Sequence, residues 1–131
     1  MVVTKTKRIL IVDREPYHQK IVQTCLKTMA GWEVLLARSS SEGLRIAEVE
    51  QPDAILLEAR MPQINGVTFV EKLHSNPATK SIPVIFLTIE PSLTERSKFL
   101  QVGAVGAIAK PFDPMTLVSK ITEPLGWTRE D

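Results

Sequence analysis

The sequence predicts a single α/β domain in which helices cover both faces of a five-stranded parallel sheet. Five short apolar runs, rich in β-branched residues, have the composition of buried strands. Five stretches with helix-start signals and apolar residues at helical spacing follow them in turn. With 131 residues, the chain has the length of one ordinary domain. Regular alternation of strand and helix favours a parallel sheet joined by right-handed crossovers.

The first three predicted elements precede the central motif, which is the apolar run at residues 54–58. Residues 8–13 form an apolar run that ends in an acid, as expected for a central strand. Glu15 and Pro16 then open a helix, because an acid and a proline both suit the first turn, and Gly31 ends it. Residues 33–37 are expected to form the second strand.

The central motif is an uninterrupted apolar run that ends in a carboxylate. Ser39 and Glu42 first make a capping-box pattern for a second helix, which ends before Pro52. Residues 54–58 then read as a buried strand that delivers its terminal acid to the edge of the sheet. Asn65 is expected to cap the helix that follows. We therefore expect the function to centre on this edge.

The last two strand and helix pairs repeat the same pattern. Residues 83–88 form the fourth apolar run, and residues 106–110 form the fifth. Ser92 and Glu95 suggest a capping box for the fourth helix. Asp113, followed by a proline, is expected to cap the last one.

Several of the predicted strands end in polar side chains. Parallel strands present their carboxyl ends at one edge, and ligands bind there where the winding direction reverses. We assume the flavodoxin-like order 2-1-3-4-5, which puts that point between the first and third strands. With this order Asp13, Arg14 and Glu58 share one pocket. Thr88 and Lys110 end the neighbouring strands beside it.

Composition narrows the range of partners and locations. The 16 Lys and Arg against 15 Asp and Glu leave a net charge of +1, which gives no electrostatic argument for nucleic acid or an anionic membrane. The single cysteine cannot form an internal disulfide. The apolar run after the basic N-terminus is too short for a signal peptide or a membrane span. We expect a cytoplasmic protein with no nucleic-acid or membrane partner. The domain is expected to span residues 8–127, with flexible tails at residues 1–7 and 128–131.

The strand-end residues closely resemble those of the receiver domain of bacterial response regulators, the CheY-like phosphoacceptor half of two-component systems. The likeness covers roughly residues 8–125. It rests on four motifs, namely Ile-Val-Asp13, Leu-Leu-Glu58-Ala-Arg-Met-Pro62-Gln-Ile-Asn-Gly66, Phe-Leu-Thr88 and Ala-Lys110-Pro111-Phe112. The resemblance implies a magnesium ion held by an acid pair, an aspartate that takes the phosphoryl group, and a threonine and a lysine that bind its oxygens. It also implies an aromatic switch on the fifth strand and a histidine kinase or downstream effector as partner.

Matched residue by residue, the resemblance is better for the scaffold than for the chemistry. Three positions agree with the family in residue type, namely Asp13, Thr88 and Lys110. Arg14 stands where the second acid belongs, and Glu58 stands where the phosphoacceptor aspartate belongs. Ala107 occupies the switch position, where the family usually has tyrosine or phenylalanine. With no large ring to move, the domain is expected to be locked rather than switched.

The two departures at the pocket have physical consequences. A guanidinium offers no lone pair to magnesium, and at 4 Å it would repel a divalent ion by about 8 kcal/mol at an effective dielectric near 20. Arg14 is therefore expected to exclude the metal, to swing into its place and to contact Glu58 or Asp13. The longer side chain at 58 moves the carboxylate outward by about 1.5 Å, and about 1 Å can already cost a hundredfold in rate. Glu58 is expected to pair with Arg14 or Lys110 instead of accepting a phosphoryl group.

We interpret the chain as a degenerate pseudo-receiver, a stand-alone interaction module that is not an enzyme and needs no cofactor. A homodimer is possible through the face of the fourth helix, fifth strand and fifth helix. Four residues could contribute to this face, although core packing is the default for each: Leu93, Phe99, Ala107 and Leu117.

Two alternatives stay open. In the first, the chain is a working receiver that a histidine kinase or a small phosphodonor phosphorylates on Asp13 or Glu58. In the second, it is a small-molecule or flavin-binding module on the same architecture. The loop at residues 13–16 lacks the glycine and hydroxyl donors that cradle a phosphate, which argues against the second.

Overall fold

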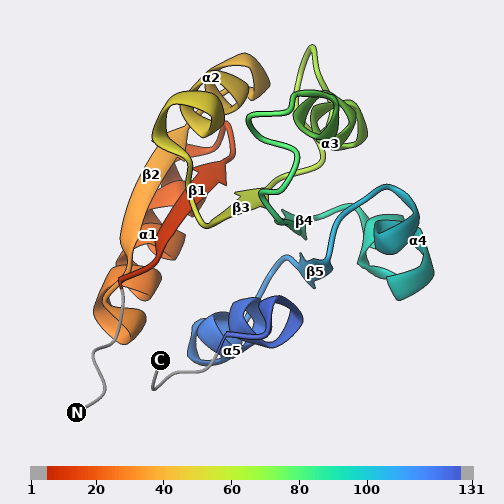
Figure 1. The fold of residues 1–131 in the computed structure, drawn as a ribbon. Coiled ribbons are helices and arrows are strands. Elements are labelled where there is room, and N and C mark those ends of the chain that lie inside the picture. The colour runs from red at the N-terminus through yellow and green to blue at the C-terminus, as the bar shows by residue number, and fades with distance from the viewer. Residues whose placement is uncertain (1–5, 128–131) are drawn as a thin grey trace.

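In a computed structural model that describes residues 6–127, helices lie on both sides of a five-stranded sheet (Figure 1). The strands are β1 (Arg8–Val12), β2 (Glu33–Ala37), β3 (Ala54–Leu57), β4 (Val84–Thr88) and β5 (Gly106–Ala109). Their order is β2-β1-β3-β4-β5, and each neighbouring pair is parallel. The assumed order is confirmed, so the winding direction reverses between β1 and β3.

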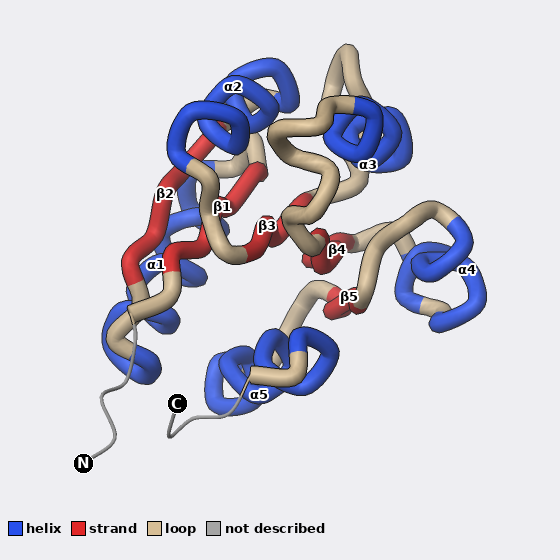
Figure 2. The backbone as a smooth tube through the Cα atoms, viewed as in Figure 1, coloured by secondary structure: helices blue, strands red, loops and turns tan. Residues whose placement is uncertain are grey.

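The five helices begin at the predicted places, with one exception. They are α1 (Pro16–Ala30), α2 (Ser40–Glu50), α3 (Gly66–Ser75), α4 (Arg96–Gln101) and α5 (Pro114–Leu125). The side chains of Ser39, Asn65 and Asp113 each accept a hydrogen bond from a backbone N–H in the first turn of the helix that follows. Helices α1 and α5 cover one face of the sheet, and α2, α3 and α4 cover the other (Figure 2).

The exception is the segment between β4 and α4. The capping box expected at Ser92 and Glu95 is wrong, because a short 3-10 helix, η1 (Pro91–Thr94), occupies this stretch. Proline favours the first position of a helical turn, so the turn begins earlier than predicted. The Ser92 hydroxyl bonds the Glu90 carboxylate at 3.3 Å, and Glu95 becomes an N-cap without a side-chain hydrogen bond.

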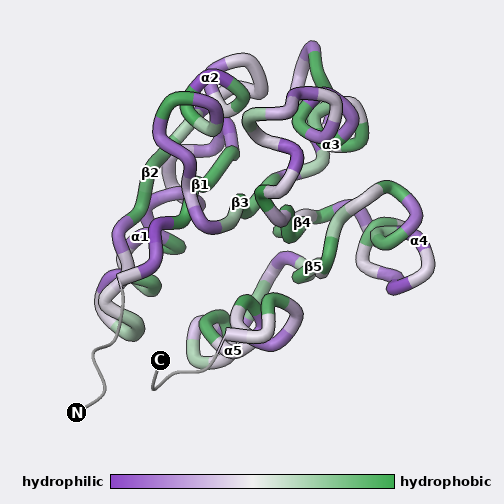
Figure 3. Tube along the Cα trace, viewed as in Figure 1, coloured by the Kyte–Doolittle hydropathy of each residue, from purple (hydrophilic) through white to green (hydrophobic). Residues whose placement is uncertain are grey.

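The core consists of two clusters, one on each face of the sheet. Along β1, Leu10 and Val12 pack with α2 and α3, whereas Ile9 and Ile11 pack with α1 and α5. Because alternate side chains point to opposite faces and both faces are covered, central strands read as continuous apolar runs. The hydrophobic colour along β3 and β4 in Figure 3 reflects this burial.

The predicted tails at residues 1–7 and 128–131 lie mostly outside the described residues. Lys7 is described, and its carbonyl accepts a hydrogen bond from Glu33 N at 2.9 Å. The Lys7 ammonium lies 4.6 Å from the ring centroid of Trp127, whose ring packs edge-on against Trp32 at 5.6 Å. Among residues 6–127, no helix has the length and apolar character needed to cross a membrane.

Candidate functional site

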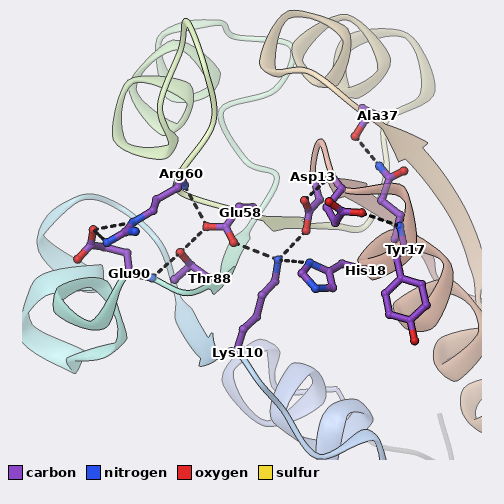
Figure 4. A network of polar contacts seen from close by, with 11 residues as sticks. Asp13, Tyr17, His18, Ala37, Glu58, Arg60, Thr88, Glu90 and Lys110 are labelled. Carbon is purple, nitrogen blue, oxygen red and sulfur yellow. Dashed lines mark hydrogen bonds and ion pairs between the residues drawn. The ribbon is translucent and has the colours of Figure 1, made fainter.

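Four polar side chains meet at the carboxyl end of the sheet (Figure 4). Asp13 follows β1, Glu58 follows β3, Thr88 ends β4 and Lys110 follows β5. Because β1 and β3 are neighbours, the Glu58 N–H donates to the Val12 carbonyl at 3.0 Å, and this bond fixes the two acids beside each other. Asp13, Glu58 and Thr88 are buried, at 5%, 6% and 0% exposed.

Lys110 is the cation that joins the two acids. Its Nζ lies 2.7 Å from Asp13 Oδ2 and 3.0 Å from Glu58 Oε1, and its side chain is only 7% exposed. The same Nζ lies 3.5 Å from His18 Nδ1. The second oxygen of Asp13, Oδ1, accepts the backbone N–H of Glu15 at 2.9 Å. Two buried carboxylates therefore share one ammonium group.

Glu58 has donors on its other oxygen as well. Oε2 accepts the Thr88 hydroxyl at 2.5 Å and the backbone N–H of Arg60 at 3.0 Å. Each oxygen of both carboxylates thus has a hydrogen-bond donor. Within residues 6–127, no buried side-chain nitrogen or oxygen lacks a partner. The site is a satisfied polar network, which stabilises a single arrangement of its members.

The network holds Glu58 in its ionised form. Burial alone would raise the pKa of Glu58, but the hydrogen bonds from the Arg60 N–H, Thr88 and Lys110, together with the Lys110 charge, lower it below its ordinary value. A carboxyl group with a lowered pKa in the folded state contributes stability above its unfolded pKa. That contribution disappears as the pH falls through the folded value.

We expect the protein to lose stability more steeply in acid than its Glu58→Gln variant. Between the unfolded glutamate pKa of about 4.3 and the lowered pKa of Glu58, the extra slope should be positive and below about 1.4 kcal/mol per pH unit, the limit for one proton. Urea unfolding at a series of pH values from neutral to about 3 measures this slope. The exposed Glu95→Gln variant is the control, and parallel curves for all three proteins would contradict the expectation.

Arg14 does not take the place predicted for it. Its side chain is exposed at the mouth of a pocket of about 340 Å³, and the described contacts include no pair between its guanidinium and Asp13 or Glu58. The bond from Glu15 N to Asp13 Oδ1 forms a tight turn with Arg14 at its tip. Lys110 already reaches both carboxylates from β5, so the predicted inward movement of Arg14 is wrong.

The predicted interaction face also needs correction. Leu117 is 0% exposed and packs with the α1 side of the core, and Phe99 is 8% exposed in the opposite cluster. Both face the sheet from their helices, so neither can contribute a free apolar surface. Leu93 and Ala107 are partly buried. Leu100, which was not predicted as part of this face, is 45% exposed.

Three residues near the site were missed from the sequence. His18 lies on α1 within reach of Lys110, although its position in the sequence shows no ligand-like spacing. Arg60 and Glu90 form an ion pair at 3.1 Å between Nη2 and Oε1. Each lies two residues beyond a strand-end site residue, and this position is the signal that could have identified them.

The loop after Glu58 depends on a close backbone approach. The Gly66 N–H donates to the Ala59 carbonyl at 2.8 Å. A Cβ atom at Gly66 would lie 2.7 Å from Ala59 Cα, which is closer than a side chain permits. Glycine at this position therefore allows the start of α3 to lie against Ala59, between Glu58 and Arg60 in the loop after β3.

Comparison with known protein families gives a match over most of the chain. The model of the response regulator receiver domain matches residues 9–122. The phosphate regulon transcriptional regulatory protein PhoB of Pseudomonas aeruginosa is 34% identical over 115 residues, which cover 88% of this chain and 50% of that protein. The chain spans about half the length of the curated relatives that it matches.

Solved structures show the same architecture. The chemotaxis response regulator CheY4 of Vibrio cholerae superimposes with a TM-score of 0.82 at 30% identity, covering 92% of this chain and 99% of that one. The receiver domain of the sensor histidine kinase PA1611 of Pseudomonas aeruginosa gives 0.81 at 27% identity, covering 94% and 100%. The structure of that domain holds a magnesium ion coordinated in the active site cleft.

Proposed function

Because this chain belongs to the response regulator receiver domain family, we propose that it is a pseudo-receiver that signals by binding another protein. Receiver domains are signalling modules of two-component systems rather than typical enzymes, and they work with histidine kinases and effectors. The proposal adds that this pocket is closed by its own side chains. Phosphorylation of Glu58 is not part of its function.

The observation that carries the proposal is that Thr88 and Lys110 both donate to the Glu58 carboxylate. In the receiver family a threonine and a lysine bind the oxygens of the phosphoryl group, and here both donate to the carboxylate of the chain itself. Glutamate is longer than aspartate by one bond, about 1.5 Å, so its carboxylate extends toward the position of those oxygens. An incoming phosphoryl group would have to displace it from buried hydrogen bonds.

The donor set at the pocket does not fit a magnesium ion. Asp13 Oδ2 and Glu58 Oε1 both accept the Lys110 ammonium, and Asp13 Oδ1 accepts a backbone N–H. Magnesium prefers nearly octahedral oxygen ligands, and the residue at the second acid position, Arg14, supplies none. We therefore include the loss of the metal in the proposal, in contrast to the magnesium-bound receiver domain of PA1611. In this protein Lys110 supplies the positive charge within the pocket.

Incubation with acetyl phosphate and magnesium, followed by intact-mass measurement, tests the proposal. We expect no phosphate adduct on this protein, because its acceptor position is a glutamate held by three donors. CheY4 of Vibrio cholerae, treated in parallel, is the positive control for the reagent. An adduct that disappears in the Glu58→Gln variant would overturn the proposal and establish a working phosphoacceptor.

A working receiver remains the second candidate, because Asp13, Thr88 and Lys110 are of the family's residue types and lie together. In that case the partner would be a histidine kinase that donates to Glu58 or Asp13. The same mass measurement separates the two candidates. A hydroxylamine-sensitive adduct would identify an acyl phosphate.

The remaining partner predictions come from the sequence. A homodimer through the α4, β5 and α5 face stays a prediction, now without Leu117 and Phe99 on its surface. The expectation of no nucleic-acid partner rests on the net charge of +1 and applies to these residues alone, since PhoB, a transcriptional regulatory protein, is about twice as long. A cytoplasmic location also stays a prediction.

A further inference from the structure

Four residues at the ends of β3 and β4 and in the segments that follow them form a closed ring of hydrogen bonds beside the acid pocket (Figure 4). Glu58 Oε2 accepts the Arg60 N–H at 3.0 Å and the Thr88 hydroxyl at 2.5 Å. Thr88 Oγ1 accepts the backbone N–H of Glu90 at 3.0 Å. The Glu90 carboxylate closes the ring on the Arg60 guanidinium, at 3.2 Å from Nε and 3.1 Å from Nη2.

The ring connects two segments beyond the point where the sheet pairs them. The register of β3 and β4 ends at Leu57 and Phe86. Glu58 and Arg60 belong to the segment that leaves β3, and Thr88 and Glu90 belong to the end of β4 and the segment that leaves it. Two contacts therefore connect the two segments. The Thr88 hydroxyl bonds Glu58 in the interior, and the Arg60–Glu90 ion pair connects the segments nearer the surface.

The ring also fixes the direction of the Thr88 hydroxyl. A hydroxyl has one proton to donate and lone pairs that accept. The Glu90 N–H occupies a lone pair of Oγ1, and the proton goes to Glu58. Thr88 itself is held in β4, where it pairs with Ala109 of β5. If the segment after β4 moves away from β3, the Glu90 N–H leaves this lone pair and the direction of the hydroxyl is no longer fixed. The geometry of the buried contact thus depends on the exposed pair.

Arg60 lies between two cavities. It lines the acid pocket of about 340 Å³ together with Asp13 and Glu58. It also lines a second cavity of about 340 Å³ between the start of α3 and η1, together with Glu90. Arg60 therefore lies at the boundary between the acid pocket and the cavity beside it.

We propose that Arg60 and Glu90 are positioning residues that latch the segment after β4 onto the loop after β3 and so hold the Thr88 hydroxyl on Glu58. The inference rests on the proposed function, because the contact that the latch maintains is part of the closed pocket. The side chains of Arg60 and Glu90 are 57% and 31% exposed, so dissolved ions reach the pair and weaken it. The latch is thus a point at which salt or a charged partner adjusts the pocket.

Amide hydrogen exchange measured by NMR in the Glu90→Gln variant tests the latch. The reporting groups are the N–H of residue 60, bonded to Glu58 Oε2, and the N–H of residue 90, bonded to Thr88 Oγ1. After correction for intrinsic rates, we expect both to exchange about two- to fivefold faster, as for loss of a partly exposed ion pair. The urea unfolding midpoint should change little, so the faster exchange reports local opening.

Two further variants separate the latch from a general effect of charge. Glu95→Gln removes an exposed carboxylate at the start of α4 and should leave both amides unchanged. The charge swap Arg60→Glu with Glu90→Arg keeps the pair with reversed polarity and should restore the protection. Unchanged amides in Glu90→Gln, or no recovery in the swap, would refute the latch. Neither result bears on the acetyl phosphate experiment, so the two proposals fail separately.

Discussion

Replacement of Lys110 by methionine is expected to lower the free energy of unfolding by about 3 to 5 kcal/mol at neutral pH. The substitution removes the ammonium that lies 2.7 Å from Asp13 and 3.0 Å from Glu58, and it leaves two buried carboxylates without a shared cation. Methionine retains an unbranched apolar stem, so lost packing contributes little. Urea unfolding of both proteins at pH 7 measures the difference.

The pH dependence of this loss of stability gives a second test of the same cause. In the Lys110→Met variant, burial without the Lys110 charge makes Glu58 harder to keep ionised, so the loss of stability should shrink as the pH falls toward about 4. Lys120→Met, at an exposed position of α5, should change stability by less than about 0.5 kcal/mol. A loss below about 1 kcal/mol for Lys110→Met would show that this lysine is not the cation on which the pocket depends.

The double variant Glu58→Asp with Arg14→Asp is expected to gain magnesium-dependent phosphorylation by acetyl phosphate. Shortening residue 58 withdraws its carboxylate by about 1.5 Å from the donors Thr88 and Lys110 and leaves them available for phosphoryl oxygens. An aspartate at exposed position 14 adds an oxygen ligand at the mouth of the pocket. Because about 1 Å of misplacement can cost a hundredfold, the variant should react at least about a hundredfold faster than the parent protein.

A time course of intact-mass spectra, with and without magnesium, measures this gain. The matched control pairs Glu58→Asp with Lys20→Asp, which reverses a charge at an exposed position of α1 that does not line the acid pocket. This control variant should gain much less phosphorylation than the first double variant. If the first double variant forms no adduct while it remains folded, the departures at residues 14 and 58 are not what separates this chain from working receivers.

Much of the fold could be predicted because its signals are local. Strands buried on both faces show as continuous apolar runs, and caps such as Asn65 and Asp113 show as single polar residues before apolar periodicity. The start of α4 failed because two local signals compete there. Pro91 begins a 3-10 turn before the Ser92 pattern can cap a helix, and the sequence does not show which signal prevails.

The set of residues that meet at the site could also be predicted from the sequence. Once the strand order 2-1-3-4-5 is assumed, Asp13, Glu58, Thr88 and Lys110 must lie at the same edge, because parallel strands end on the same side. Leu117 and Phe99 follow the default of core packing, but the sequence did not exclude them from the interaction face. Helical spacing places a residue on a face, but the packing of that helix decides whether the face is covered.

By itself the sequence determined the five strands, their covering helices and the strand ends at which a charged pocket forms. Only the tertiary structure decided which cation fills that pocket. Arg14 is next to Asp13 in the chain yet is exposed and has no described ion pair with it, whereas Lys110, 97 positions away, lies 2.7 Å from the same carboxylate. The physical reason is that the reach of a side chain depends on the direction of its backbone across the sheet. That direction is fixed by turns and strand pairing between distant segments and not by neighbours in the sequence.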